Sequence, residues 1–370
     1  MVETNRNALP AGQSLGGYEI EAVLGSGGFG ITYKARESII GRIVAIKEYL
    51  PSDIAVRDRE SSSIQPTDPR NVDDYDWGLS RFRQEAQTLV TFRHPNIVAV
   101  LHYFEANNTA YLVMEYEGGD DLGTLLKRAG PLSETELRRI VVPLLDGLAR
   151  VHAAGFLHRD IKPENIYVRD DGTPVLLDFG AARQAMGARS HPMTNIVSMG
   201  YAPFEQYVSD SKQGPWSDIY ALGAVLYHVV TGRRPVEATA RVRADAIVPA
   251  MEAGRGRYSA AFLRAIDSAL AVREEDRPQS VEAFLAMIDP SVVETVRSPG
   301  LPAESWAPTE DEVKQVTRHL AEAIGPIASV QVRRIAPRVR DLQQLYQRLS
   351  EKIENIEDRE RFLDKLRKLG

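Results

Sequence analysis

Apolar and polar residues alternate, or apolar residues run together, in four segments of the first third of the chain. These segments are 18–24, 31–37, 42–50 and 110–116, and all are rich in β-branched and aromatic residues. Such patterns predict β-strands. One helix is predicted among them, near residues 79–91. The first part of the chain therefore predicts a strand-rich lobe.

After residue 121 the pattern changes to helical periodicity, in segments 134–153, 218–231 and 260–272. The most apolar run, 219–230, is too short to cross a bilayer, so it predicts a buried core helix. A helical lobe thus follows the strand-rich lobe, and the predicted fold class is α+β.

Residues 289–308 are rich in proline and lack periodicity, which predicts a linker. Beyond them, Thr309 and Glu312 form a capping-box pattern ahead of an apolar helical series. Two more apolar series follow within 342–353 and 362–366. The segment 309–370 is therefore predicted to be a small all-α module.

Composition and charge narrow the possible functions. Of the 370 residues, 43% are hydrophobic and 26% charged, which is ordinary for a globular protein. The absence of cysteine excludes disulfides and thiolate metal sites. A formal net charge of −6 gives no positive field to attract nucleic acid or anionic lipid, so neither partner is expected. No membrane span or leader is apparent, which predicts a cytoplasmic protein.

A glycine-rich pattern, G-x-G-x-x-G, occupies residues 25–30. Glycine lets backbone amides approach phosphates, because it has no β-carbon in the way. A dinucleotide-binding turn would need a helix after the glycines, whereas Ile31, Thr32 and Tyr33 continue as a strand. The setting favours a phosphate-covering hairpin, and for the motif alone a plain glycine turn remains an alternative.

Lys47 ends the segment Val-Ala-Ile-Lys on an otherwise apolar strand, where its ammonium group needs anionic partners. ATP phosphates and Glu85, on the predicted helix, are the expected partners. Taken singly, each residue could equally be a solvated charge at the edge of an element.

The segment 158–165, HRDIKPEN, is far more specific, and Asp178-Phe179-Gly180 follows it. These two motifs resemble the catalytic loop and the metal-binding turn of protein kinases. The D-x-K arrangement of Asp160 and Lys162 resembles that of serine/threonine kinases. VAIKEYLP, GYAPFEQY and the 37 residues between Lys47 and Glu85 resemble a subset of bacterial (Hanks-type) serine/threonine kinases.

The resemblance implies a two-lobed protein kinase fold over residues 15–288, a linker at 289–308 and an appended module at 309–370. It implies transfer of the γ-phosphate of ATP to protein hydroxyls, in bacterial signalling. Asp160 would orient the acceptor hydroxyl, and Lys162 would neutralise the transferring phosphate.

The resemblance also assigns the nucleotide and the metal. Asn165 and Asp178 would hold Mg²⁺ or Mn²⁺, and Lys47, paired with Glu85, would contact ATP. The other residues expected around ATP are Leu24, Gly25, Gly27, Gly28, Gly30, Ala45, Met114, Glu115, Tyr116, Asp120 and Tyr167.

Structural roles follow from the same resemblance. His158, Phe179, Leu89 and Val100 would stack between the lobes, which makes His158 a packing residue. Asp218 would anchor the backbone of the catalytic loop. Glu205 and Arg277 would form a buried ion pair.

Regulation is expected at the activation segment, residues 178–205. Arg159 would receive a phosphate from this segment, and Thr194 lies at the usual position for autophosphorylation. Ser198 is expected to stay unmodified, because it aligns with a hydroxyl that contacts Asp160 and Lys162. The alternative is that Thr194 is an exposed loop residue and that Arg159 pairs elsewhere.

Two other functions are alternatives to a protein kinase. A nucleotide-binding scaffold without activity would usually lack Lys47, Asp160 or Asp178. A small-molecule kinase of the aminoglycoside or choline type usually lacks a segment like Ala202-Pro203-Phe204-Glu205 and the Asp218 and Arg277 matches. Protein substrates are therefore the expected partners, and the C-terminal module is expected to serve docking or self-association.

Overall fold

The computed structural model describes residues 5–179, 198–208, 211–289, 310–324, 328, 332, 342–350, 353 and 356–367. The chain divides into two compact units, Met1–Val296 and Arg297–Gly370, and each is described by itself.

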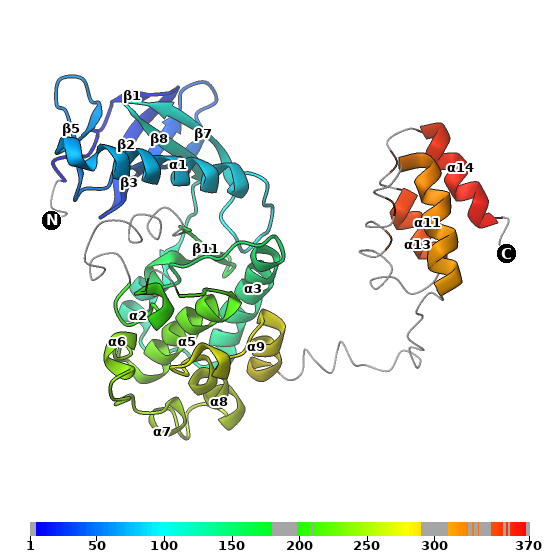
Figure 1. Cartoon of the computed structure of the whole chain (residues 1–370). Helices are drawn as coiled ribbons and strands as arrows, with labels where there is room; N and C mark the ends of the chain where they lie inside the picture. Colours follow the sequence, from blue (N-terminus) through cyan, green and yellow to red (C-terminus); the bar gives the residue numbers. More distant parts are fainter. Residues whose placement is uncertain are drawn as a thin grey trace. The chain divides into compact units, whose positions relative to one another are not determined.

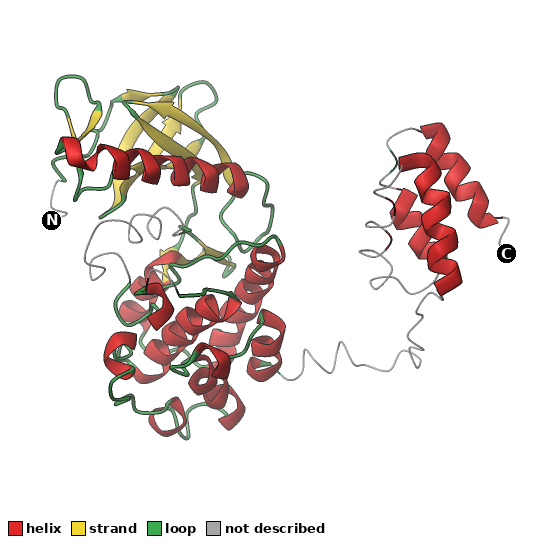
Figure 2. Cartoon of the chain, viewed as in Figure 1, coloured by secondary structure: helices red, strands yellow, loops and turns green. Residues whose placement is uncertain are grey.

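A six-stranded antiparallel sheet forms the first lobe (Figures 1 and 2). The four strands predicted from the sequence are confirmed. In spatial order the strands are β1 (Ser14–Leu15), β2 (Tyr18–Gly27), β3 (Gly30–Glu37), β4 (Ile43–Tyr49), β8 (Thr109–Glu115) and β7 (Val100–Ala106).

Helix α1 (Val72–Leu89) packs against β7 and β8 and crosses the sheet in Figure 1. It begins seven residues before the predicted start at Leu79. Asp73 and Asp74 lie in its first turn, where negative charge is favourable because it faces the positive end of the helix dipole. Acidic residues of the long insertion therefore start this helix.

The remaining part of the insertion forms a small hairpin of β5 (Ala55–Arg57) and β6 (Ile64–Pro66), followed by the 3₁₀ turn η1 (Pro69–Asn71). The hairpin is a separate two-stranded sheet. It is joined to the main sheet by a buried ion pair between Arg57 and Glu48, and the N–H of Ile64 donates to the carbonyl of Asn107, in the turn between β7 and β8, at 2.8 Å.

The second lobe is helical, and α5 lies at its centre. The predicted core run 219–230 lies within this helix and is buried apart from His228. Helix α3 begins at a capping box between Ser133 and Glu136. The helices are α2 (Leu122–Ala129), α3 (Glu134–Ala153), α5 (Pro215–Thr231), α6 (Ala238–Arg241), α7 (Ala250–Ala253), α8 (Ala260–Ala269) and α9 (Val281–Ile288).

Short elements carry the polar loops at the edge of this lobe that faces the sheet. A three-stranded sheet has the order β11 (Pro174–Leu176), β10 (Ile166–Val168), β9 (Asp120–Asp121). The 3₁₀ turns η2 (Pro163–Asn165), η4 (Phe204–Gln206) and η5 (Glu274–Asp276) complete the lobe.

The second unit contains α11 (Glu310–Ile324), α13 (Leu342–Ser350) and α14 (Ile356–Arg367), which confirms the predicted helical series. It has its own core, in which Tyr346 stacks on Phe362 and its hydroxyl lies 2.6 Å from Nδ1 of His319. Thr309, the predicted cap, lies outside the described residues. In the described part of both units, no helix is long and apolar enough to cross a membrane.

Candidate active site

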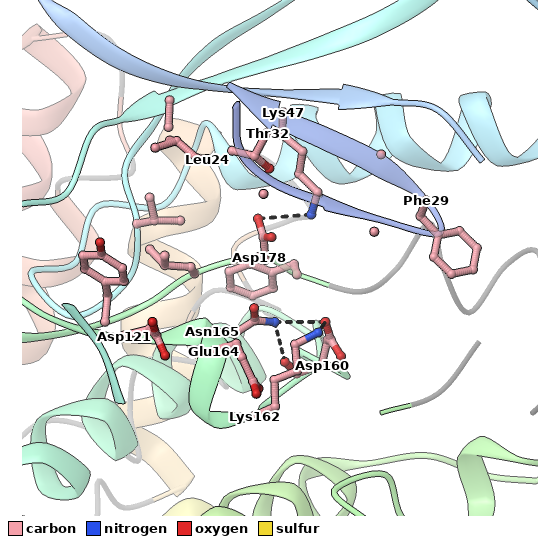
Figure 3. A pocket seen from close by; sticks show the side chains of 18 of the residues that line it. Leu24, Phe29, Thr32, Lys47, Asp121, Asp160, Lys162, Glu164, Asn165 and Asp178 are labelled. Carbon is pink, nitrogen blue, oxygen red and sulfur yellow. Dashed lines mark hydrogen bonds and ion pairs between the residues drawn. The ribbon is translucent and has the colours of Figure 1, made fainter. Parts of the chain in front are cut away.

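A cavity of about 750 Å³ lies between the strand-rich lobe and the helical lobe (Figure 3). This volume is within the range of about 300–1,000 Å³ that is common for small-molecule sites. Its walls come from the glycine hairpin, β4, β8, loop 158–165 and the residues after β11. The motifs singled out in the sequence therefore meet in one place.

The glycine hairpin forms the roof of the cavity. Gly27 pairs with Gly30, which leaves Gly28 and Phe29 as a two-residue turn. A Cβ added to Gly27 or Gly28 would meet no atom within 4 Å, whereas one added to Gly30 would lie 2.1 Å from the carbonyl oxygen of Glu48. Gly30 is thus required by strand packing, and Gly27 and Gly28 leave open space beneath the turn.

Lys47 projects from β4 into the cavity, and its Nζ lies 3.1 Å from Oδ1 of Asp178 (Figure 3). Glu85 of α1 lines the same cavity. Burial lowers the pKa of Arg159. The negative charge of Glu85 opposes this shift and so favours the charged guanidinium. The described ion pair of Lys47 is with Asp178, and pairing between Lys47 and Glu85 stays a prediction.

Asp160 is the centre of a polar cluster, with only 5% of its surface exposed. Its Oδ1 accepts a hydrogen bond from the Ser198 hydroxyl at 2.7 Å. Its Oδ2 accepts bonds from Nζ of Lys162 at 3.0 Å and from Nδ2 of Asn165 at 2.9 Å. Nδ2 of Asn165 also donates to the Asp160 carbonyl at 2.8 Å, which fixes the orientation of the amide.

Asp218 of α5 holds the loop that carries Asp160. Its Oδ2 accepts the backbone N–H of His158 and its Oδ1 that of Arg159, both at 2.8 Å, and Nε2 of His152 donates to Oδ2 at 2.8 Å. Burial alone would raise the pKa of Asp218, but the hydrogen bond and charge of His152 hold it below its usual value. The predicted anchoring role is confirmed. Arg159 has a φ of +67°, a strained conformation that these bonds help to maintain.

His158 is a packing residue in the structure, as predicted. Its ring is fully buried, its centroid lies 4.5 Å from that of Phe179, and its Nε2 donates to the carbonyl of Leu177 at 2.7 Å. Burial lowers the pKa of the imidazole, which favours the neutral ring. Leu89 and Val100, the other two residues of the predicted stack, are buried.

Most residues expected around the nucleotide line the cavity, and the one exception lies near the ribose position. Asp121 is a lining residue, while Asp120 forms an ion pair with Arg128 at 2.6 Å. The expected ribose contact is therefore moved from Asp120 to Asp121 as a proposal. The residues that do line the cavity are Leu24, Gly25, Gly27, Gly28, Gly30, Ala45, Lys47, Met114, Glu115, Tyr116 and Tyr167.

Comparison with known families agrees with this arrangement. Residues 18–284 match the protein kinase domain. The chain belongs to the protein kinase family. Residues 311–370 match a domain of unknown function, DUF8082.

The kinase has bacterial relatives. It is 32% identical to serine/threonine-protein kinase pkn3 of Myxococcus xanthus, over 78% of this chain and 52% of that protein. It is 36% identical to serine/threonine-protein kinase PknA of Nostoc sp., over 60% of this chain and 38% of that protein. The chain thus spans about half or less of these relatives. They place it in the bacterial-type (Hanks-type) serine/threonine kinases, as the sequence predicted.

Solved structures also resemble the kinase. A structure described as the PpkA-294 apo form matches with a TM-score of 0.70 and 38% identity, over 76% of this chain and 100% of that chain. The Mycobacterium tuberculosis PknI kinase domain matches with a TM-score of 0.57 at 21% identity, which supports the fold alone. The predicted two-lobed kinase fold is confirmed.

A buried ion pair braces the end of the activation segment. Nη1 of Arg277 donates to Oε1 of Glu205 at 2.7 Å, and the Ser217 hydroxyl donates to the same oxygen at 2.7 Å. Both charged side chains are at most 1% exposed. The predicted pair is confirmed, and it fixes η4 to α5 within the kinase.

Two residues of the site, Thr194 and Arg234, differ in how far the sequence and the structure define them. Thr194, the proposed phosphorylation site, lies outside the described residues, so its role stays a prediction. Arg234 was not anticipated, yet it lines the cavity and its guanidinium lies 5.4 Å from the ring of Tyr201. Arg234 belongs to no sequence motif. It follows the end of α5 at Thr231, and only the position of that helix end brings it to the cavity.

Proposed function

We propose that the chain is a serine/threonine protein kinase that transfers the γ-phosphate of ATP to protein hydroxyls. The observation that carries this proposal is the cluster around Asp160, which faces the Lys47–Asp178 pair across one cavity (Figure 3). Phosphoryl transfer needs positioned cations, metal-binding oxygens and a carboxylate near the acceptor, and the cavity offers all three.

The donor set suits a hard divalent cation. Nδ2 of Asn165 is committed to Asp160, so its amide oxygen remains available, and Figure 3 shows that oxygen on the side of Asp178. Amide and carboxylate oxygens, together with substrate phosphates, are the usual ligands of Mg²⁺. Asn165 and Asp178 would hold the ion, with Mg²⁺ or Mn²⁺ as candidates. When bound, it would neutralise charge on the phosphates.

The residues of the chain would then divide the work. Asp160 would accept a hydrogen bond from the substrate hydroxyl and so orient it toward the phosphate. Lys162, already held beside Asp160, would offset charge on the transferring group. Ser198 occupies Oδ1 of Asp160 at 2.7 Å, which supports a structural rather than a modified role for this hydroxyl.

The Glu205–Arg277 brace supports a protein substrate, because it fixes the segment on which a peptide would lie. We further propose a kinase domain at 15–288, a linker at 289–308 and a module at 309–370 that docks to partners or self-associates. Because ATP is a cytoplasmic substrate, the proposed site of action is the cytoplasm, in signalling by autophosphorylation and phosphorylation of other proteins.

The test is phosphotransfer by the full chain with ATP and Mg²⁺, followed by mapping of the modified residues by mass spectrometry. Asp160→Asn should lower kcat by about 10²–10⁴-fold, the range for a positioned acid or base, with little change in ATP affinity. Asp146→Asn, at an exposed surface position, is the matched control. Phosphotransfer by Asp160→Asn at the rate of the control would refute the assignment.

A further inference from the structure

The tip of the glycine hairpin is hydrogen-bonded to the segment that follows β4. The N–H of Leu50 donates to the carbonyl of Phe29 at 3.0 Å, and the N–H of Ser52 donates to the carbonyl of Gly28 at 2.9 Å. The Ser52 hydroxyl lies 3.4 Å from the same Gly28 oxygen. The strand pairing of β3 with β4 therefore continues past β4 and reaches both residues of the turn.

The segment then turns sharply into the insertion hairpin. The carbonyl of Pro51 accepts the N–H of Ile54 at 3.1 Å and that of Ala55 at 2.9 Å. Ile54 and Ala55 are each only 1% exposed, so the turn is fixed by packing as well as by hydrogen bonds. Only two residues separate Ile54 from Arg57.

Arg57 anchors this segment by a buried ion pair with Glu48 of β4. Glu48 is fully buried and also accepts hydrogen bonds from the hydroxyls of Tyr33, at 2.8 Å, and Tyr111, at 2.5 Å. Arg57 in addition donates to the carbonyl of Asn7 at 2.7 Å. A buried charge with this many partners is held firmly in one position.

We propose that residues 50–57, here called the strap, are a positioning element that holds the glycine hairpin over the phosphates of ATP. This inference rests on the proposed function, in which ATP binds beneath the hairpin. A loop that is already ordered loses less conformational entropy when its ligand binds, so the strap should strengthen ATP binding. Ser52 would affect ATP binding indirectly, by holding the Gly28 carbonyl through its N–H. It does not itself contact the substrate.

One substitution isolates the strap. Ser52→Pro removes the N–H that Gly28 accepts, and the turn tolerates it, because proline is favoured at the position after the first residue of a turn. Ser52→Ala is the matched control, since it removes the hydroxyl and keeps the N–H. The dissociation constant and KM for ATP should rise about two- to tenfold in Ser52→Pro, the scale of one net hydrogen bond. In Ser52→Ala both should stay close to wild type.

A second pair of variants weakens the Arg57–Glu48 ion pair without changing the sequence of the glycine hairpin. Arg57→Met should raise KM for ATP in the same direction, and Arg57→Lys, which keeps a cation, should restore part of the affinity. The KM for a protein substrate should not change, whereas general unfolding would lower the concentration of active enzyme, and so Vmax, without raising the KM for ATP. Thermal unfolding of each full-length variant reports any loss of folded protein.

The outcomes separate the strap from the proposed function. If wild type transfers phosphate and Ser52→Pro matches Ser52→Ala in ATP affinity and KM, the strap has no positioning role. If wild type binds ATP without transferring phosphate, the proposed function fails, and the ATP affinities of the two variants still decide the strap. Failure of wild type to bind ATP would overturn both.

Discussion

Asp218→Asn tests how far the catalytic loop depends on one buried carboxylate. The side chain is fully buried, and its two oxygens accept the N–H groups of His158 and Arg159 and a hydrogen bond from His152. Asparagine has nearly the same shape but only one acceptor oxygen. Its amide nitrogen would therefore face a donor whichever way it is turned.

The expected loss can be worked from these contacts. A hydrogen bond to a charged group contributes about 1.5–3 kcal/mol, and a buried donor left without an acceptor costs about 1–3 kcal/mol. At least one backbone N–H is left without an acceptor and another loses its charged acceptor, so the variant should lose about 2.5–6 kcal/mol of unfolding free energy. Since Asp160 lies in the loop that relaxes, and a displacement of about 1 Å can cost about 10²-fold in rate, kcat should fall by about that factor.

The assay compares kcat with urea unfolding, and Asp267→Asn is the matched control. Asp267 also accepts two backbone N–H groups, those of Ala250 at 2.6 Å and Met251 at 3.0 Å, but it lies away from the loop. It should lose stability and keep kcat. An Asp218→Asn protein with wild-type kcat, or a control whose kcat falls equally, would refute the reasoning.

The pH dependence gives an independent check. The folded pKa of Asp218 is lower than its ordinary value of 3.8, so its stabilisation is complete above that value and is lost as the pH falls through the folded pKa. Wild type should therefore lose more stability on acidification below about pH 4 than Asp218→Asn does. Parallel pH profiles of the two proteins would contradict the role given to this carboxylate.

Three further predictions concern the metal, the activation segment and the C-terminal unit. Asp178→Asn should raise the Mg²⁺ concentration needed for half-maximal activity by at least about tenfold, because it removes a proposed metal oxygen; an unchanged Mg²⁺ titration at saturating ATP would argue against that role. Thr194→Ala should lower activity and remove a major phosphopeptide, because it removes the phosphate, of about −1.5 to −2 charge, that we expect beside Arg159. The buried Nε of Arg159 lacks a hydrogen-bond partner among the described residues. Equal activity with phosphopeptides only elsewhere would contradict this. Deleting 309–370 should leave kcat and KM within about twofold, because the two units have separate cores; an insoluble or inactive product would show that the tail supports the kinase domain.

Sequence reasoning succeeded where a short segment carries its own chemistry. The loop 158–165 holds Asp160, Lys162 and Asn165 within six residues, so local backbone geometry brings them together. The central helix was also predictable, because its apolar run leaves little alternative to burial. The position of Asp218 followed from the family resemblance, since 57 residues separate it from Asp160.

Reasoning from the sequence was weaker where a contact depends on tertiary packing. The helix predicted from Leu79 in fact begins at Val72, within the insertion. Asp120 and Asp121 are adjacent, and only the approach of β10 decides which one faces the cavity. The pairing of Arg57 with Glu48 could not be inferred, because nothing in the sequence gives the path of the insertion.

One signal for that pairing is nevertheless present in the order of residues on β4. Side chains on a strand alternate between its faces, so Lys47, which enters the cavity, requires Glu48 to face the opposite side. That side is closed, and a carboxylate there needs a cation. The insertion supplies Arg57, and the chain between the two is hydrogen-bonded to the tip of the glycine hairpin. In the proposed function, the same strand would present the lysine to ATP and anchor the strap, and the insertion would then be part of the nucleotide site.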